Sequence, residues 1–582
     1  MPIDADLNDP ALRRRAVQAA RQEVPFDLLI TGGTVLDLVT GEERAADIGI
    51  VGALIASVHA QGSSPKAETY EDATGKVLLP GLIDTHMHVE SSMITPMEYA
   101  AHMVPRGVTT ALWDPHELAN VAGRAGMDYA FAAARAAALR FLPLVPTCVP
   151  SAPGFETSGA DFDAETIAEL LARPDTHGAA ELMTMYPLLT GNQRAQDIVA
   201  AGLASGKRVC GHARGLSGRD LNAFVAAGVA TDHELISGED LIEKLRAGLT
   251  IELRGSHKHL LPEFVDALLN LGHMPQTVTL CTDDVFPNDL YERGGLDDLL
   301  RNLIALGLPP SWTYRAACLN AAISISRPDL GLLAPGRRAD VLVLSDLKSV
   351  ALESVFMDGK PVARKGAFSG EQKNVVLPVA LTNTVRARKT VPRDFEILAS
   401  GPQVDLPTLR KPRFPEWGQR RFDVAEGNVK IPPDILRMAV IQRHSPDAEI
   451  QNALLEDWGP LRGAVATSVS HDSHNLTIFG QTPEDMSIAA NAVIDQQGGL
   501  AVASSGKLLA RVPLPVAGLL NECSLSEIAD YFVTWENALN EITEWRPPYF
   551  VLKALFGASL VCNPGPRLSD LGIVEPFLTA HE

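Results

Sequence analysis

Two histidines separated by one residue, His86 and His88, close the apolar segment GLIDTHMH. Residues two apart in a β-strand point to the same side, so both imidazoles could bind one metal ion. Further imidazole and carboxyl groups end later apolar segments, namely Glu181, His212, His233 and the adjacent Asp283 and Asp284. Imidazole and carboxylate ligands without thiolates suit Zn²⁺, Mn²⁺, Fe²⁺ or Ni²⁺ at a catalytic site.

These residues lie at the ends of short apolar segments that alternate with helix-length stretches. Together with the segment at 81–88, the segments lie at 108–114, 141–149, 179–185, 208–213, 230–235, 250–255 and 279–284. The alternation predicts an α/β fold, a TIM-like (β/α)8 barrel of about 250 residues. Barrel enzymes place catalytic groups at the carboxyl ends of the strands, so we expect the polar residues to meet at one rim.

Gly-punctuated β-rich runs flank the predicted barrel at residues 26–79 and 335–375. We expect the flanks to pair into one composite β-sandwich domain, with the barrel, residues 80–334, inserted between them. Residues 1–25 are expected to form an N-terminal helical extension. Residues 376–582 mix strand and helix patterns after a Pro/Arg-rich connector, which predicts a C-terminal α+β domain.

The composition is that of an acidic globular protein. A formal net charge of −21 without a basic block argues against nucleic acid and membrane surfaces as partners. Hydrophobic residues make up 46% of the chain, enough for large buried cores. The six cysteines form no C-x-x-C pair, and the N-terminus lacks the apolar core of a signal peptide. We therefore expect a cytoplasmic protein.

Several motifs together carry a family resemblance. They are PGLIDTHMH (80–88), HVESSM (88–93), DPHELANVAG (114–123), AELM (180–183), GHA (211–213), CTDD (281–284), GRRADVLVLSDL (336–347) and SVSHDSHN (468–475). This combination resembles the amidohydrolase superfamily and, within it, the bacterial adenine deaminase family. The resemblance extends over nearly the whole chain.

The resemblance implies a binuclear metal centre. His86 and His88 match the ligands of the first metal, and His212 and His233 match those of the second. Glu181 matches the carboxylate that bridges both. We expect two divalent ions per chain, Mn²⁺ or Fe²⁺, with Zn²⁺ as an alternative.

The aspartate of the eighth strand has two candidates, Asp283 and Asp284. The superfamily uses the aspartate directly after Thr or Ser, which favours Asp283 as ligand and catalytic residue. Adjacent strand residues face opposite sides, so only one should reach the metals. The implied reaction is the hydrolysis of a cyclic amidine, adenine, to hypoxanthine and ammonia by hydroxide activated at two metal ions, with this aspartate transferring the proton. Such a hydrolase would serve purine salvage and adenine catabolism.

Residues beside the predicted ligands are candidates for contacting the purine. Glu90, Ser91 and Ser92 could hydrogen-bond a planar substrate, although the serines equally suit a helix cap. His116 and Glu117 either orient the purine and protonate a ring nitrogen, or form a capping cluster after a proline.

The seventh predicted strand departs from the family pattern because LRGSHKH lacks a Glu between Arg and Gly. This departure leaves the substrate-binding role of Arg254 and the role of Ser256 open. His257 and His259 form a second H-x-H, which we expect on a surface loop.

The segment SVSHDSHN is dense in polar residues. One interpretation is a polar turn between two strands with both histidines solvated. The other is a loop at the barrel mouth, where His471 and Asp472 bind adenine or exclude water. An extra metal site is a third alternative.

Competing functions share some of these features. A cyclic-amide hydrolase of the dihydroorotase or hydantoinase type resembles this pattern, but those enzymes bridge their metals with a carboxylated lysine and the segment AAELMTM contains none. The motif of the cytidine-type zinc deaminases is absent. A non-catalytic amidohydrolase-like scaffold would have lost ligands, yet every ligand position is filled. We expect a small-molecule purine as substrate and a homo-oligomer, a dimer or larger.

Overall fold

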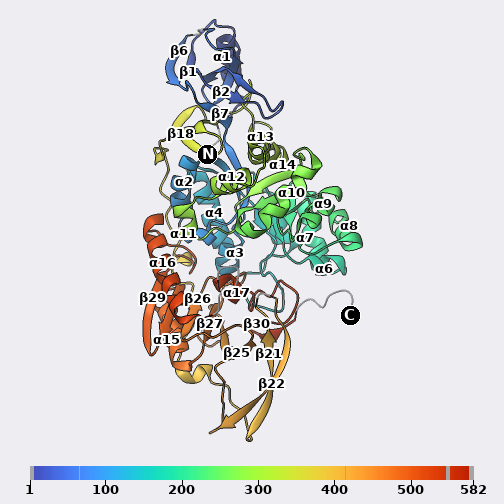
Figure 1. Ribbon diagram of the computed structural model, residues 1–582, viewed down its shortest axis with the longest axis vertical. Coiled ribbons are helices and arrows are strands. Elements are labelled where there is room, and N and C mark those ends of the chain that lie inside the picture. The colour runs from blue at the N-terminus through green and yellow to red at the C-terminus, as the bar shows by residue number, and fades with distance from the viewer. Residues whose placement is uncertain (1–4, 64–65, 413, 545–550, 576–582) are drawn as a thin grey trace.

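The computed structural model describes residues 5–63, 66–412, 414–544 and 551–575. Residues 1–4 of the predicted extension, and residues 545–550 and 576–582 of the predicted C-terminal domain, lie outside this part. The molecule is elongated, with an N-terminal β-rich part at one end, a helix-rich centre and a C-terminal part at the other end (Figure 1).

Asp9 is the N-cap of helix α1 (Pro10–Ala20), and its side chain accepts a hydrogen bond from the Ala11 N–H. It is followed by a four-stranded sheet of order β5-β4-β1-β6 and a seven-stranded sheet of order β20-β19-β18-β17-β7-β2-β3. The strands are β1 (Phe26–Thr31), β2 (Thr34–Leu36), β3 (Glu43–Ala45), β4 (Asp47–Val51), β5 (Leu54–His59), β6 (Ala67–Asp72), β7 (Val77–Pro80), β17 (Val341–Asp346), β18 (Ala351–Met357), β19 (Lys360–Arg364) and β20 (Ala367–Phe368).

Strands β7 and β17 connect the two sides of the chain that flank the central region. They pair antiparallel, with Val341 opposite Pro80. Apolar residues from both sheets, among them Ile30 and Phe356, pack into one hydrophobic cluster. The strand before the central region and the strand after it are therefore neighbours in the seven-stranded sheet.

The central region contains parallel strands in two sheets, β10-β9-β8 and β11-β12-β13-β14-β15-β16. The strands are β8 (Leu82–Met87), β9 (Val108–Trp113), β10 (Arg140–Pro143), β11 (Val145–Pro146), β12 (Gly178–Leu182), β13 (Arg208–Gly211), β14 (Thr231–Asp232), β15 (Thr250–Arg254) and β16 (Val278–Cys281). A parallel bridge between Met87 and Asp283 links the end of β8 to the residues after β16.

The third predicted strand differs from the prediction because it is split. Its first part, β10, pairs with β9, and its second part, β11, pairs with β12. Pro143 and Pro146 end the two parts and donate no backbone hydrogen bond, which favours short strands here. Within the described residues, strand pairing thus gives two parallel sheets and not one closed sheet of eight strands.

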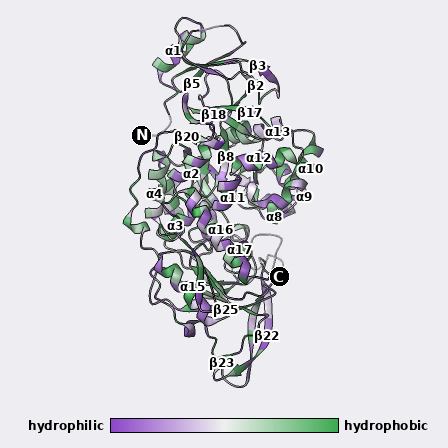
Figure 2. Ribbon diagram, turned by 60° about the vertical axis from the view of Figure 1, so that its left-hand side comes forward, coloured by the Kyte–Doolittle hydropathy of each residue, from purple (hydrophilic) through white to green (hydrophobic). Residues whose placement is uncertain are grey.

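Amphipathic helices separate the central strands. In α10, the buried residues Leu261, Phe264, Val265 and Leu268 follow helical spacing, and Figure 2 shows hydrophobic and hydrophilic residues mixed along this helix. The helices are α2 (Pro96–Met103), α3 (His116–Ala122), α4 (Arg124–Ala136), α5 (Ala164–Leu171), α6 (Met185–Leu189), α7 (Gln193–Ala204), α8 (Gly218–Ala226), α9 (Gly238–Arg246), α10 (Leu261–Leu271), α11 (Pro287–Glu292), α12 (Leu296–Ala305), α13 (Pro310–Arg315) and α14 (Ala321–Ser324).

The C-terminal part is a nine-stranded sheet of order β23-β22-β21-β25-β24-β27-β26-β28-β29 with three helices. Its elements are β21 (Gln403–Arg410), β22 (Glu416–Ala425), β23 (Asn428–Val429), β24 (Leu436–Ile441), β25 (Ile450–Glu456), β26 (Ala464–Thr467), β27 (Leu476–Gly480), α15 (Pro483–Asp495), β28 (Gly499–Ser504), β29 (Lys507–Pro513), α16 (Leu525–Ile542) and α17 (Val551–Phe556). Helix α16 packs against α11, where Phe532 stacks on Phe286.

No helix among the described residues combines the length and the apolar character needed to cross a membrane.

Candidate active site and metal centre

Four histidines gather at the ends of three central strands. His86 is the last but one residue of β8, and His88 directly follows the strand, with their Nε2 atoms 3.1 Å apart. His212 follows β13 and His233 follows β14, and their Nε2 atoms are also 3.1 Å apart. The ring of His86 stacks on that of His233 at 4.1 Å, so the two pairs face each other.

The carboxylate of Glu181, near the end of β12, lies between the two histidine pairs. Its Oε2 is 3.1 Å from His233 Nε2 and in closer contact with His212, while its Oε1 is 3.9 Å from His88 Nε2. Burial alone would raise the pKa of Glu181, but His212 and His233 hold it well below its usual range. An ionised carboxylate that faces both pairs has the position of a bridging ligand.

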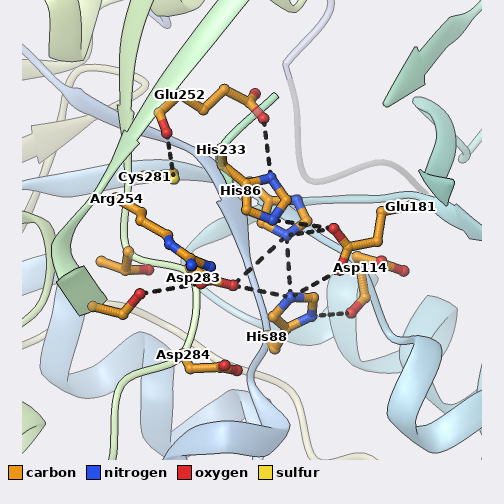
Figure 3. A network of polar contacts seen from close by, with 12 residues as sticks. His86, His88, Asp114, Glu181, His233, Glu252, Arg254, Cys281, Asp283 and Asp284 are labelled. Atoms are coloured by element: carbon orange, nitrogen blue, oxygen red, sulfur yellow. Dashed lines mark hydrogen bonds and ion pairs between the residues drawn. The ribbon is translucent and has the colours of Figure 1, made fainter. Parts of the chain in front are cut away.

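Asp283, and not Asp284, faces the histidines (Figure 3). Its Oδ1 is 3.5 Å from His88 Nε2, whereas Asp284 points away and its Oδ1 accepts a hydrogen bond of 2.5 Å from Ser91 Oγ. Burial would raise the pKa of Asp283, but the guanidinium of Arg254 holds it well below its usual range. Asp283 is therefore the ionised carboxylate at the candidate centre.

The donor atoms fit a divalent metal ion. His88 donates from Nδ1 to the Asp114 carbonyl oxygen at 2.9 Å, so Nε2 is the nitrogen that faces His86 and Glu181. Two nitrogens bound to one zinc ion at about 2.0–2.1 Å would lie about 3 Å apart, which is the spacing within each histidine pair. Among the residues that the structure describes, the donors that converge between the two histidine pairs are nitrogen and oxygen atoms, which suits Mn²⁺, Fe²⁺ or Zn²⁺.

Sequence reasoning did not single out two buried carboxylates near these histidines. Asp114 accepts from His116 Nδ1 at 3.0 Å through its side chain. Glu252 on β15 lies with its Oε2 3.8 Å from His233 Nδ1 and pairs with Arg208 at 2.6 Å. Asp114 directly follows β9 and so fits the strand-end pattern of the ligands, whereas Glu252 lies in the middle of β15 and gave no such signal.

Arg254 extends the site on the other side of Asp283. It donates to Asp283 Oδ2 at 2.6 Å and pairs with Glu234 Oε1 at 2.8 Å, while Ser256 Oγ donates to Asp283 Oδ2 at 3.1 Å. The prediction of a surface loop is wrong for His257, which is buried with its Nε2 2.9 Å from Arg254, because the turn after β15 folds it over that arginine. His259 is exposed, as predicted.

Glu90, Ser91 and Ser92, the candidates for contacting the purine that follow the first histidine pair, are not among the residues that line the pocket. Glu90 accepts from Trp113 Nε1 at 2.9 Å, and burial together with Glu117 raises its pKa to about 8. Ser92 donates to the Val89 carbonyl oxygen, and Ser91 donates to Asp284. Neither serine provides the N-cap of α2, which is Thr95.

The loop between β26 and β27 reaches this site from the C-terminal part. Asp472 Oδ1 is 3.6 Å from His116 Nε2, and His471 Nδ1 is 3.7 Å from Glu117 Oε1. Asp472 is buried and the side chain of His471 is only 16% exposed. The alternative of a solvated turn is therefore wrong.

A pocket opens onto the histidines and is lined by both parts of the molecule. The central region contributes the metal-ligand candidates except His86, together with His116, Arg254 and Ser256. The C-terminal part contributes His471, Asp472, Phe556, Leu560 and Cys562, among others. A small planar molecule bound there would lie between the two parts.

Comparisons with known proteins agree with this two-part site. Residues 77–362 match the amidohydrolase family, and residues 414–576 match the adenine deaminase C-terminal domain. "Adenine deaminase 2" of Rhizobium meliloti (strain 1021) is 54% identical, across 98% of this chain and 96% of that protein. "Adenine deaminase" of Serratia proteamaculans (strain 568) is 47% identical, across 98% of each.

A solved adenosine deaminase from Xanthomonas campestris with bound zinc aligns with a TM-score of 0.46 and 15% identity, covering 59% of this chain and 94% of that chain. The two full-length relatives are far more similar in sequence. The chain belongs to the adenine deaminase family, in which an amidohydrolase region precedes an adenine deaminase C-terminal domain.

Proposed function

We propose that this chain hydrolyses adenine to hypoxanthine and ammonia. The observation that carries the proposal is the carboxylate of Glu181 between two histidine pairs, with the ionised Asp283 facing the same space. The names of the full-length relatives support adenine as the substrate. The absence of a lysine from β12 disfavours a cyclic-amide hydrolase with a lysine bridge.

We propose that His86 and His88 hold one divalent ion and that His212 and His233 hold a second. Glu181 would contact both ions, and Asp283 the first. When bound, such ions lower the pKa of water from about 15.7 to about 7 and so supply hydroxide at neutral pH. We favour Mn²⁺ or Fe²⁺, with Zn²⁺ as the alternative.

Asp283 is the proposed general base and acid. It takes the proton released as water adds to C6 of adenine and delivers it to the leaving amine, a role worth roughly 10²–10⁴-fold in rate. Arg254 and Ser256 hold its outer oxygen and thereby aim the inner oxygen at the reacting centre. Asp284 remains the alternative in this role.

The purine is proposed to bind between the central strands and the C-terminal loop. His116, Arg254, His471 and Asp472 line the pocket and offer hydrogen bonds to the ring edge. Glu117 lies within reach of His471 and is the proposed proton donor to a ring nitrogen. Glu90, Ser91 and Ser92 are proposed to support the pocket through neighbouring side chains. Ser91 bonds to Asp284, and Glu90 bonds to Trp113.

We also propose the larger architecture that this function uses. The two parallel sheets would form one (β/α)8 barrel, residues 80–334, inserted in a composite β-sandwich, residues 26–79 and 335–375. Residues 1–25 would be a helical extension and residues 376–582 a C-terminal α+β domain. Assembly as a homo-oligomer and a cytoplasmic location remain predictions.

An activity assay tests the proposed reaction. Metal-reconstituted protein is incubated separately with adenine, adenosine, dihydroorotate and hydantoin, while ammonia release and the purine ultraviolet spectrum are followed. Ammonia and hypoxanthine from adenine alone are expected. Turnover of dihydroorotate or hydantoin without turnover of adenine would replace the proposal with the cyclic-amide alternative.

Glu181→Gln should lower the occupancy of both metal ions together. An amide oxygen is a weaker ligand than a carboxylate oxygen, and this side chain faces both histidine pairs. Metal content per chain after dialysis is the measurement. Loss of only one equivalent would identify Glu181 as a ligand of a single ion.

His471→Ala and Asp472→Ala should each lower kcat/KM for adenine while metal content stays at the parent level. Both side chains line the pocket without touching a histidine of the two pairs. Asp495→Asn, an exposed position in the same part of the chain, is the matched control. If both loop variants kept the activity of the parent, the loop would not contribute to binding of the substrate.

A further inference from the structure

Asp232 connects the backbones that carry two of the candidate metal ligands. It is the last residue of β14, it is fully buried and it directly precedes His233. Its Oδ1 accepts from the Ala213 N–H at 2.8 Å and from the Glu234 N–H at 3.0 Å. These two residues directly follow His212 and His233. One carboxylate oxygen thus fixes the chain immediately after both histidines.

A buried lysine holds this carboxylate in place. Lys244 on α9 is fully buried, and its Nζ lies 2.8 Å from Asp232 Oδ2 and 3.0 Å from Asp240 Oδ2. It also donates to the Glu234 carbonyl oxygen at 3.4 Å. Desolvating such a pair is costly, and an apolar pair of similar volume is often as stable. A gain in stability alone is therefore a poor explanation for this buried ion pair. A need to hold the Asp232 carboxylate where it accepts hydrogen bonds from both ligand loops explains it better.

The other half of the candidate centre has a similar arrangement. Asp84 on β8 is fully buried, and its Oδ1 accepts from the Thr282 N–H at 3.0 Å and from the His86 N–H at 3.4 Å. Its Oδ2 accepts from Thr282 Oγ1 at 2.6 Å. Asp84 thus ties the backbone of His86 to that of the residue before Asp283. Each half has one buried aspartate that joins two ligand-bearing segments.

The contacts of Asp232 also reach the opposite side of the site. The Glu234 backbone that it holds carries the side chain that pairs with Arg254 at 2.8 Å. Arg254 in turn donates to Asp283 Oδ2 at 2.6 Å. A shift of the Glu234 backbone would therefore displace His233 directly. Asp283 keeps a second donor in Ser256, so its own position should change much less.

We propose that Asp232, held by Lys244, is a positioning residue for the His212–His233 half of the metal centre. It sets the distance between the two imidazoles by accepting from both following N–H groups. The inference rests on the proposed function, because it takes His212 and His233 as ligands of one ion. Loss of partners behind a metal ligand typically costs about 10–100-fold in metal affinity, and we expect a loss of that size at this half alone.

The test is Co²⁺ titration of metal-free protein, followed by absorption spectroscopy and by metal analysis after dialysis. Parent protein should bind two equivalents. Asp232→Ala should bind one equivalent as the parent does and the other about 10–100-fold more weakly. Asp232→Asn keeps an acceptor oxygen, so a smaller loss at the same equivalent is expected.

Asp240→Asn is the matched control, because Asp240 is the other acidic partner of Lys244. It accepts from the Ile236 N–H, three residues beyond His233, and not from the residue that directly follows His212 or His233. It should bind both equivalents as the parent does. Equal weakening by Asp240→Asn and Asp232→Ala would overturn the proposal, since only the buried charge would then matter. Parent-like affinity of Asp232→Ala at both equivalents would also overturn it.

If Asp232→Ala does not fold, as judged by circular dichroism, Asp232→Asn decides the question. Selective weakening of one equivalent supports the positioning role, and weakening of neither or of both equally overturns it. Failure of the proposed function has a different result, because the parent protein itself would then bind no Co²⁺ at stoichiometric concentration.

Discussion

Asp283→Asn should lower kcat for adenine by about 10²–10⁴-fold while KM changes much less. The carboxylate acts chiefly in the transition state, where it transfers a proton, and not in binding the purine. Its Oδ1 is 3.5 Å from His88 Nε2, and its Oδ2 is held by Arg254 and Ser256. The asparagine keeps this shape but loses the negative charge and the basicity of the carboxylate. Steady-state kinetics over a range of adenine concentrations measure both constants.

Asp284→Asn is the matched control, since Asp284 is the chain neighbour of Asp283 and bonds to Ser91 instead. We expect a mild effect on kcat. Metal content is measured for both variants, so that loss of a ligand is distinguished from loss of the base. A large fall of kcat in Asp284→Asn with a mild effect of Asp283→Asn would reverse the assignment.

The strands of the central region could be predicted from the sequence because short apolar runs alternate there with helix-length stretches. The break in the third strand was not predicted, because the run at 141–149 is apolar as far as Pro146 and the two halves differ in which neighbouring strand they pair with. Pro143 and Pro146 were the visible signal. Their effect depends on which neighbour each half pairs with, and that is a property of the sheet.

The ligand candidates could also be predicted, because parallel strands bring their carboxyl ends together. The structure brings His86, His88, Glu181, His212 and His233 into one cluster. Spacing alone left Asp283 and Asp284 unresolved. Asp283 has a left-handed backbone with a φ of 56°, so simple strand alternation does not apply at this position.

Residues that act on the backbone were beyond sequence reasoning. In the sequence, Asp232 is only a polar residue before a ligand candidate. Its proposed role depends on the N–H groups of Ala213 and Glu234, which follow two different strands. The approach of Asp472 to His116 joins positions hundreds of residues apart, and no local pattern encodes it. His257 was misplaced for a similar reason, because its burial depends on contact with Arg254.

His86→Ala and His212→Ala should each remove metal from the protein and abolish most of the turnover of adenine. Each substitution deletes a donor nitrogen, and each affects a different histidine pair. The loss should exceed the roughly 10–100-fold typical of partners behind a ligand, because the ligand itself is missing. Metal analysis after dialysis and kcat/KM for adenine are the two measurements.

His259→Ala removes an exposed histidine close in sequence to the site and should leave both measurements unchanged. The two ligand variants also differ from each other in an informative way. If the histidine pairs hold separate ions, His86→Ala should spare metal bound by His212 and His233, and His212→Ala should spare metal bound by His86 and His88. Because Glu181 faces both pairs, the spared ion should bind more weakly than in the parent. Equal adenine turnover by chelated and metal-reconstituted parent protein would refute the metal mechanism, whatever the variants show.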